Sequence, residues 1–172
     1  MTVIINPDEE MMMLDLETRS TDIQNGSIAQ IGAIKFTLNG GIIDEFSINL
    51  KHDPRFDISE STMKEFWAKQ PQEVRDSVFG NQVHFEDGLR EFDNWIGKKW
   101  FYKIVWSHGK EFDICMLNNY FKVAGILWPF NHPRTLDTRT IFAVAGINTY
   151  SNSHNALEDC RNQIKLLQEA LC

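Results

Sequence analysis

The chain has 172 residues, of which 42% are hydrophobic, 24% are charged and 12% are aromatic. This length is typical of one domain and the composition excludes a largely disordered protein, so we expect a single domain over residues 1–172. The longest apolar runs fall far short of the roughly 20 residues that a membrane span needs, and the first ten residues lack the pattern of a signal peptide. We therefore expect no membrane association.

The cysteines and the net charge indicate the cellular compartment and limit the kinds of site and partner that we expect. The three cysteines, Cys115, Cys160 and Cys172, are widely spaced and form no C-x-x-C pair, which argues against a disulfide framework or a zinc site. Free cysteines are typical of a reducing compartment, so we expect a cytoplasmic protein. The net charge of −7 repels nucleic acid unless divalent cations or a basic patch reverse it locally. The sequence has no Lys/Arg-rich tract, so a nucleic-acid footprint should be small.

The first fifty residues predict three strands. Residues 10–17 contain a short apolar run that is typical of a buried strand. Residues 27–38 and 42–50 are rich in isoleucine and phenylalanine, and these alternate with polar residues. Asn39-Gly40-Gly41 between them is a strong hairpin signal. We therefore expect the protein to open as a meander of strands.

Two helical patterns follow the meander. Residues 59–70 begin with serine and threonine, either of which can cap a helix, and Pro71 stops the pattern. Residues 71–79 form a second, shorter pattern of the same kind.

The remaining chain alternates helices and strands. Residues 85–97 place Leu89, Phe92 and Ile96 on one helical face. After them the sequence predicts a strand at 102–107, a helix at 112–125, a short strand running into a helix at 134–146, and an amphipathic helix at 155–172. Strands first, followed by alternating helices and strands, imply an α/β sandwich around a mixed sheet.

Asp15 and Glu17 end the first predicted strand with one leucine between them. Residues two apart in a strand point to the same side, so both carboxylates share one face, with about 6.5 Å between their Cα atoms. Two like charges at this spacing are costly without a counter-charge. Two interpretations remain open: a solvated strand end, or a site for a hard cation such as Mg²⁺ or Mn²⁺, which prefers oxygen ligands.

A histidine and two further aspartates add to this pattern. His154 and Asp159 lie five residues apart, with His154 near the start of the last predicted helix and Asp159 within it. Asp113 follows a predicted strand-to-helix junction, where capping of the helix is an equally good interpretation. Taken alone, a histidine before a helix is most often a surface residue. The order D-x-E, then D, then H-x-x-x-x-D is much harder to reach by chance.

This order resembles the DnaQ-like 3′–5′ exonucleases of the DEDDh type, which have a ribonuclease H-like fold. "LDLET" (14–18) looks like their first motif, "HGKEFD" (108–113) like their second and "HNALED" (154–159) like their third. The resemblance spans roughly residues 10–172. It implies an α/β, ribonuclease H-like fold with a mixed five-stranded sheet flanked by helices.

The middle of the chain is most similar to the phage DexA-type exonucleases and their bacterial relatives, some of which are exoribonucleases. Residues 61–75 and 134–142 carry this similarity. Two positions depart from the wider family. Thr18-Arg19-Ser20 stands where the family often has Thr-Thr-Gly, and Gly109 stands where it usually has asparagine. The departures leave the substrate contacts at these positions open.

The resemblance implies a metal-dependent phosphodiester hydrolase that releases nucleoside 5′-monophosphates. It would use two divalent cations, Mg²⁺ or Mn²⁺, both contacted by Asp15. The implied metal ligands are Asp15, Glu17, Asp113 and Asp159. His154 would be the general base, because an imidazole can accept a proton near neutral pH. A tyrosine has this role in the DEDDy type, and Tyr150 lies four residues out of register for it.

The expected substrate is the 3′ end of a single-stranded nucleic acid. Thr18 would approach the terminal nucleotide. Trp67 is a candidate for stacking on a base, and a core position is its alternative. Arg139 is a candidate for a phosphate contact, with a salt bridge to Asp137 or another acid as its alternative. The sequence does not choose between DNA and RNA.

Other partners and functions fit the same sequence. Related exonucleases often pair, so a homodimer is one expected assembly. The chain could also be a proofreading subunit of a polymerase, or a non-catalytic ribonuclease H-like module that binds nucleic acid or protein. The full set of five site residues speaks against an inactive module, because such a module has no chemical need for all of them.

Overall fold

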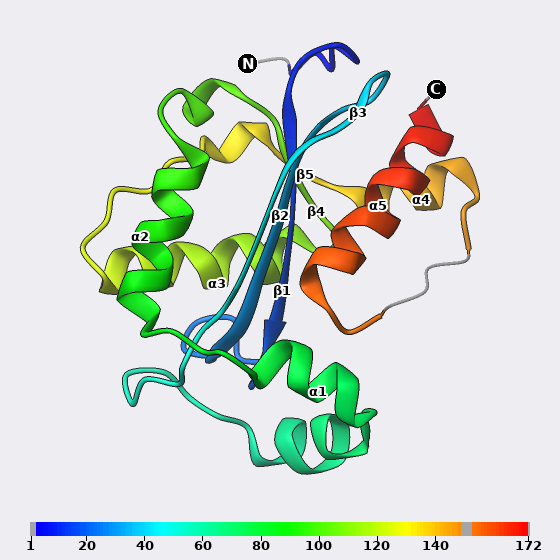
Figure 1. Cartoon of the computed structure of the whole chain (residues 1–172). Helices are drawn as coiled ribbons and strands as arrows, with labels where there is room; N and C mark the ends of the chain where they lie inside the picture. Colours follow the sequence, from blue (N-terminus) through cyan, green and yellow to red (C-terminus); the bar gives the residue numbers. More distant parts are fainter. Residues whose placement is uncertain (1–2, 149–152, 172) are drawn as a thin grey trace.

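The fold is built on a five-stranded mixed sheet with helices on both of its faces (Figure 1). The computed structural model describes residues 3–148 and 153–171. The strands follow the order β3-β2-β1-β4-β5 across the sheet. Their bounds are β1 Met11–Thr18, β2 Ile28–Thr37, β3 Gly41–Asn49, β4 Val105–Ser107 and β5 Thr135–Asp137. The predicted mixed five-stranded sheet is confirmed.

The first three strands form the antiparallel meander that the sequence predicts. β1 lies at the centre of the sheet and is buried on both faces, which explains its continuous apolar run. Met12 and Leu14 pack into the core on one side, while Met11 and Met13 pack into the core on the other. The same alternation puts the next residue, Asp15, on the side of β1 that carries Met11 and Met13.

Helices cover the two faces of the sheet separately. α2 and α3 lie on one face, α4 and α5 lie on the other, and α1 lies at one end (Figure 1). The bounds are α1 Gln72–Phe79, α2 Phe85–Ile96, α3 Lys110–Val123, α4 Thr138–Ala145 and α5 Ala156–Leu171. The predicted apolar faces are buried, at Leu89 and Phe92 in α2 and at Cys160 and Ile164 in α5. In the described part of the chain, no helix combines the length and apolar character that crossing a membrane would require.

The segment between β3 and α1 differs from the helix predicted at residues 59–70. It contains a wide π-helical turn, Thr62–Phe66, and then a 3₁₀ turn, Trp67–Lys69. Adjacent residues of a regular helix point about 100° apart. Here the change of pitch brings the rings of Phe66 and Trp67 into edge-to-face contact, with centroids 5.0 Å apart. Sequence periodicity does not predict such a change.

β4 and β5 are short, and their carboxyl ends lie at the edge of the sheet where the candidate site forms. A strand was predicted at residues 102–107, whereas β4 spans only Val105–Ser107. β4 runs parallel to β1, and β5 runs parallel to β4, with Ser107 paired to Leu14 and to Asp137. Parallel strands bring their carboxyl ends to one edge of a sheet, where ligand sites of α/β proteins form.

Gly32 in β2 lets α5 approach the sheet closely. Gly32 pairs in register with Asp15 of β1. A β-carbon at residue 32 would lie 2.5 Å from the backbone nitrogen of Leu157 and 2.7 Å from the carbonyl oxygen of Ala156. The first turn of α5 therefore rests directly on the sheet backbone. Asp159 lies in that turn, so this contact brings it towards β1.

We predict that Gly32→Ala lowers the free energy of unfolding by about 1–3 kcal/mol, the usual cost of forcing extra volume into a packed region. The added methyl group must push α5 away from the sheet. Urea denaturation of the variant and the wild-type protein measures this cost. An unchanged unfolding midpoint would contradict the close approach.

Candidate active site

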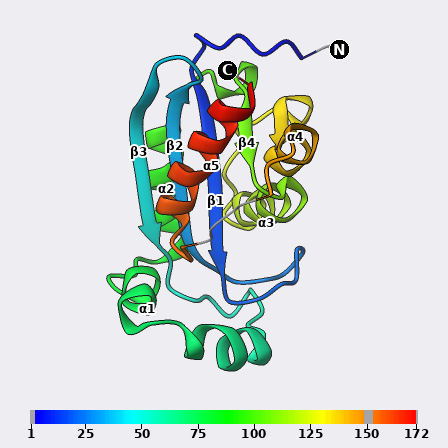
Figure 2. The same cartoon turned by 90° about the vertical axis from the view of Figure 1, so that its right-hand side faces the viewer.

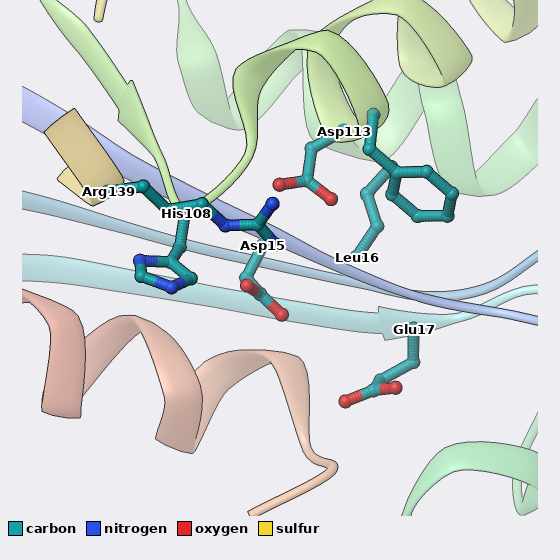
Figure 3. A pocket seen from close by; sticks show the side chains of 7 residues that line it. Asp15, Leu16, Glu17, His108, Asp113 and Arg139 are labelled. Carbon is teal, nitrogen blue, oxygen red and sulfur yellow. The ribbon is translucent and has the colours of Figure 1, made fainter. Parts of the chain in front are cut away.

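Three carboxylates meet between the end of β1 and the first turn of α5. Asp15 and Glu17 point to the same side of the sheet, towards α5, as strand alternation predicts (Figure 3). Asp159 approaches from α5. One oxygen from each of the three lies within 4.8 Å of the others. The structure therefore brings three of the four predicted metal ligands into one cluster.

Asp113, the fourth predicted ligand, faces the same pocket from α3 (Figure 3). It is buried in the first turn of that helix, and its Oδ2 accepts a hydrogen bond from Ser107 Oγ at the end of β4. Asp113 lies outside the three-carboxylate cluster but shares with Asp15 and Glu17 a pocket of about 330 Å³. The other residues that line this pocket are Leu16, His108, Phe112 and Arg139.

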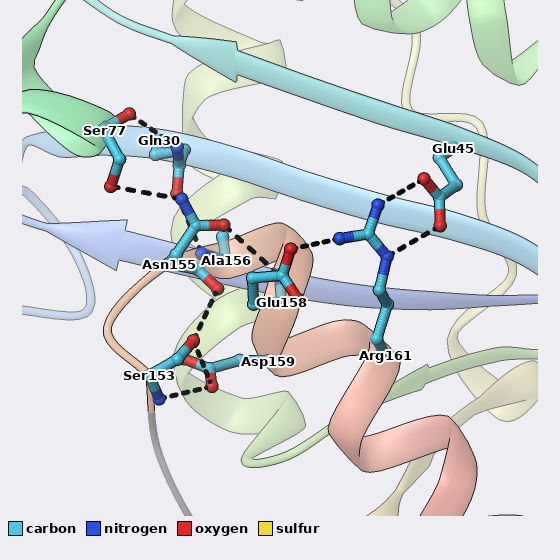
Figure 4. Close-up of polar contacts among 9 residues, drawn as sticks. All are labelled: Gln30, Glu45, Ser77, Ser153, Asn155, Ala156, Glu158, Asp159 and Arg161. Carbon is cyan, nitrogen blue, oxygen red and sulfur yellow. Dashed lines mark hydrogen bonds and ion pairs between the residues drawn. The ribbon is translucent and has the colours of Figure 1, made fainter. Parts of the chain in front are cut away.

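Among the described residues, hydrogen bonds hold the carboxylate of Asp159 through its Oδ1. The backbone N–H and the Oγ of Ser153 donate to Oδ1 at 2.7 Å and 2.9 Å (Figure 4). Oδ2 is buried and has no hydrogen-bond partner in the described part of the chain. Leaving a buried carboxylate oxygen without a partner costs free energy. A cation among the three carboxylates would supply the missing partner.

Two glutamines that no motif indicates hold the cluster in position. Gln163 in α5 donates from Nε2 to Oδ1 of Asp15 at 2.8 Å. Gln30 in β2 pairs in register with Glu17, and its Oε1 accepts the backbone N–H of Ala156 at 2.8 Å. Gln30 also donates from Nε2 to the carbonyl oxygen of Ser77 at 3.1 Å (Figure 4). Gln30 therefore ties the start of α5 to the sheet and to α1.

The surroundings of the four carboxylates oppose their ionisation. Burial is the largest cause, and it raises the pKa of Asp15 well above its ordinary value, with Asp113 and Glu17 adding to the effect. Burial, with the charges of Asp159 and Asp113, raises the pKa of Glu17 to about 8. Burial also raises the pKa of Asp113 to about 7 and, against the hydrogen bonds from Ser153, that of Asp159. Full ionisation at neutral pH therefore needs a counter-charge.

His154 lies beside the cluster and does not line the pocket. Its backbone is left-handed, with φ at +55°, which is uncommon for a residue other than glycine. Its ring packs edge to face against Phe66, with centroids 4.8 Å apart. His154 is close enough to Asp159 to lower the pKa of that carboxyl. Tyr150, the residue out of register, lies outside the described residues.

Trp67 corrects a sequence prediction, because it offers no face to a base. Its side chain is 2% exposed and contacts Phe66 and Phe79. Its Nε1 donates to the backbone oxygen of Thr18 at 2.8 Å. The core interpretation is correct, and the role of Trp67 is to hold the end of β1. Thr18 itself is half-buried, and its Oγ1 donates to the carbonyl oxygen of Ser20 at 2.8 Å.

Arg139 lies at the pocket, over Gly109. A β-carbon at residue 109 would lie 3.2 Å from the guanidinium carbon of Arg139. Gly109, which departs from the family pattern, therefore leaves room for the guanidinium group of Arg139. Asp137 accepts the backbone N–H groups of Arg139 and Lys110 at 2.8 Å and 3.0 Å. Asp137 thus caps α4 and α3 rather than pairing with the guanidinium group, which stays directed at the pocket (Figure 3).

His108 is a pocket residue to which the sequence interpretation gave no role. Its Nδ1 lies 2.9 Å from Oγ1 of Thr138. Burial, with the nearby charge of Arg139, lowers its pKa. Its position directly after a buried strand, at the edge where parallel strands end, was the signal that could have found it.

A family model matches almost the whole chain. Residues 10–171 fit the model of the 3′–5′ exoribonuclease Rv2179c-like domain. The chain belongs to this family. It is therefore a 3′–5′ exoribonuclease-like nuclease domain, and its resemblance to the DnaQ-like exonucleases is confirmed. A search of curated protein sequences gave no match.

Solved structures of other exonucleases share the fold. The nuclease domain of 3′hExo, a DEDDh family member bound to rAMP, matches with a TM-score of 0.68 and 11% identity, over 94% of this chain and 91% of that one. E. coli exonuclease I in complex with a dT13 oligonucleotide matches with a TM-score of 0.68 and 14% identity, over 94% and 41%. Cell-death related nuclease 4 matches with a TM-score of 0.63 and 16% identity, over 95% and 64%.

These likenesses confirm the ribonuclease H-like fold of this family member. The three proteins differ greatly in the share of their own length that this chain covers. The chain spans 64% of cell-death related nuclease 4 and 41% of exonuclease I, so both contain large parts that have no counterpart here.

The raised pKa values predict that, without divalent cations, stability falls as the pH rises. The carboxyl of Glu17 has an ordinary pKa of 4.5 and a pKa of about 8 in the folded protein. Between these values the folded state binds more protons than the unfolded state, so deprotonation favours unfolding. We expect the Tm in EDTA to fall from about pH 5 to about pH 8, and Mn²⁺ to restore it at the upper end.

Thermal denaturation of metal-stripped protein across this pH range measures the effect. The control is Asp87→Asn, which removes an exposed acid away from the site. It should leave the slope of Tm against pH unchanged. A Tm that stays level or rises with pH in EDTA would contradict the assignment of the buried carboxyls.

Proposed function

We propose that this family member is a divalent-cation-dependent 3′–5′ exonuclease of the DEDDh type, which releases nucleoside 5′-monophosphates from single-stranded ends. One observation carries the proposal. Three carboxylates from two elements lie within 4.8 Å of one another, and a buried oxygen of Asp159 has no partner in the described part of the chain. The family to which the chain belongs supports the exonuclease reaction.

The donor set fits Mg²⁺ or Mn²⁺, because every candidate ligand is a carboxylate oxygen. Asp15, Glu17 and Asp159 would hold one cation. Asp113, which faces the same pocket, would help Asp15 to hold a second. When bound, such cations lower the pKa of water and neutralise charge on a phosphate.

The chain's other side chains would bind the phosphate and move the proton. Arg139 would bind a phosphate of the substrate, because it is an exposed guanidinium group at the pocket. His154 would accept a proton from the attacking water, because its ring lies near Asp159. The anchored neighbour Ser153 and the ring of Phe66 hold His154 in its left-handed conformation. Leu16 and Phe112 give the pocket apolar walls.

The proposed substrate is the 3′ end of single-stranded RNA, with single-stranded DNA as the second choice. The family description names an exoribonuclease. Among the structural neighbours, 3′hExo binds rAMP and exonuclease I binds a dT13 oligonucleotide. Thr18, at the end of β1, would approach the terminal nucleotide.

Digestion of matched 5′-labelled RNA and DNA oligonucleotides with Mn²⁺ tests the function. We expect stepwise shortening with the 5′ label retained, and EDTA should stop it. Internal cleavage, loss of the label in the first products, or no shortening at all would contradict the proposal. No shortening together with retained binding would favour the non-catalytic module.

We predict that Asp15→Asn abolishes cleavage and keeps the fold. The change removes a ligand and also relieves repulsion with Glu17, so the Tm in EDTA should stay level or rise. The matched control is Asp87→Asn on the exposed face of α2, which should keep full activity. If Asp15→Asn keeps more than about a tenth of the wild-type rate at saturating Mn²⁺, the two-cation assignment fails.

For His154→Ala we predict a turnover rate lower by about 10²–10⁴, the usual contribution of a general base. The Mn²⁺ affinity should hardly change, because the carboxylates supply the ligands. Turnover measured against pH and Mn²⁺ concentration separates the alternatives. Rescue by excess Mn²⁺ would indicate direct ligation instead, and a rate within about twofold of wild type would exclude the general-base role.

The single domain over residues 1–172, the cytoplasmic location and the homodimer stay predictions. Light scattering of the purified chain would measure its assembly state. Co-purification with a polymerase would favour the proofreading alternative.

A further inference from the structure

Two hollows continue the active-site pocket along α3. The pocket at Asp15 shares Phe112 and Arg139 with a neighbouring hollow of about 360 Å³. That hollow shares Ile23 with a third, of about 510 Å³. Because each shares a lining residue with the next, the three hollows adjoin in a row that starts at the carboxylates. Lys110, Glu111 and Asp137 also line the middle hollow.

The third hollow is lined mainly by amides, and we call it the amide hollow. Its polar lining consists of Gln24, Asn25, Asn118, Asn119 and Lys122, with Cys115 beside them. Among the described residues that line it, Lys122 is the one charged group. This is notable in a chain with 24 acidic and 17 basic residues. The lining side chains thus carry one positive charge and no carboxylate. A lysine suits a phosphate, and amides can both donate to and accept from the edges of unpaired bases.

One wall of the amide hollow is the loop between β1 and β2, which reaches beside α3 (Figure 2). Asn119 donates from Nδ2 to the carbonyl oxygen of Gln24 at 2.6 Å. Asp22 Oδ1 accepts the backbone N–H of Gln24 at 2.8 Å, and the carbonyl oxygen of Asn25 accepts the N–H of Asp57 at 2.7 Å. The loop is therefore held before any ligand arrives, which lowers the entropy cost of binding.

The other wall is an exposed stripe along α3. Phe112, Cys115, Asn119 and Lys122 are spaced by three or four residues and share one helical face. From Phe112 to Lys122 the helix rises about 15 Å. That length accommodates up to about four stacked nucleotides at about 3.4 Å each.

We propose that the amide hollow binds the nucleotides that precede the 3′-terminal one. Lys122 contacts a backbone phosphate, Asn25 and Asn118 contact base edges, and Phe112 and Ile23 line the passage from the active-site pocket. The inference rests on the proposed function, because it needs a strand whose 3′ end lies at the carboxylates. With these contacts, the protein binds a strand of several nucleotides more tightly than it binds a dinucleotide.

Lys122→Glu tests the inference through its dependence on substrate length. Against a single-stranded oligonucleotide of eight residues, we expect the KM to rise about tenfold with kcat unchanged, since one phosphate contact is lost and a repulsion gained. Cleavage of a dinucleotide, which fills only the active-site pocket, should keep its rate. Asn118→Ala should raise the KM for the longer strand by a smaller factor, without a change of charge.

Lys165→Glu is the matched control, because it makes the same charge change at an exposed site on α5, across the sheet. It should leave both substrates unaffected. Equal losses in the two glutamate variants, a loss on the dinucleotide, or no change in the Lys122 variant would overturn the inference.

A binding measurement tests this inference separately from the proposed function. If the wild-type protein cleaves neither substrate, the proposed function fails. Fluorescence anisotropy of a labelled eight-residue strand then decides the inference alone. Weaker binding by Lys122→Glu than by Lys165→Glu would support the amide hollow, and equal binding would overturn it.

Discussion

The close approach of α5 to the sheet at Gly32 is the constraint on which the candidate active site depends. A side chain at this position would collide with the backbone at Ala156, so the glycine fixes how near the helix can lie. Gln30, two residues earlier in β2, then binds the first N–H of the helix at 2.8 Å. Asp159 follows in the same turn and meets the two carboxylates of β1. The site exists only where the sheet and α5 are packed together.

Bringing these carboxylates together opposes stability, and the rest of the fold compensates for it. Residues 11–14 are almost completely buried between the two cores, and burial of each large apolar side chain stabilises by about 1.5–3 kcal/mol. The strand therefore cannot shift to move Asp15 and Glu17 apart. A local arrangement that conflicts with stability inside a well-packed frame is typical of functional sites.

The sequence predicted the parts of this site that follow local rules. Strand alternation placed Asp15 and Glu17 on one side, and the spacing of the last motif put Asp159 on a helix. It failed at the regular helix predicted for residues 59–70, because helix periodicity does not hold where the pitch changes. Gln30 could not be found either, since its partner Ala156 lies 126 residues away in the chain. Contacts between distant segments carry no local pattern, so only the structure reveals them.

The most direct measurement of the central claim is an anomalous difference map from crystals grown with Mn²⁺ and a nucleoside 5′-monophosphate. The account predicts a peak among the carboxylates of Asp15, Glu17 and Asp159, within ligand distance of Asp159 Oδ2, which has no partner among the described residues. A second peak should lie between Asp15 and Asp113. A map with no peak at these carboxylates, at a millimolar concentration of Mn²⁺ and a pH near 8, would contradict the account.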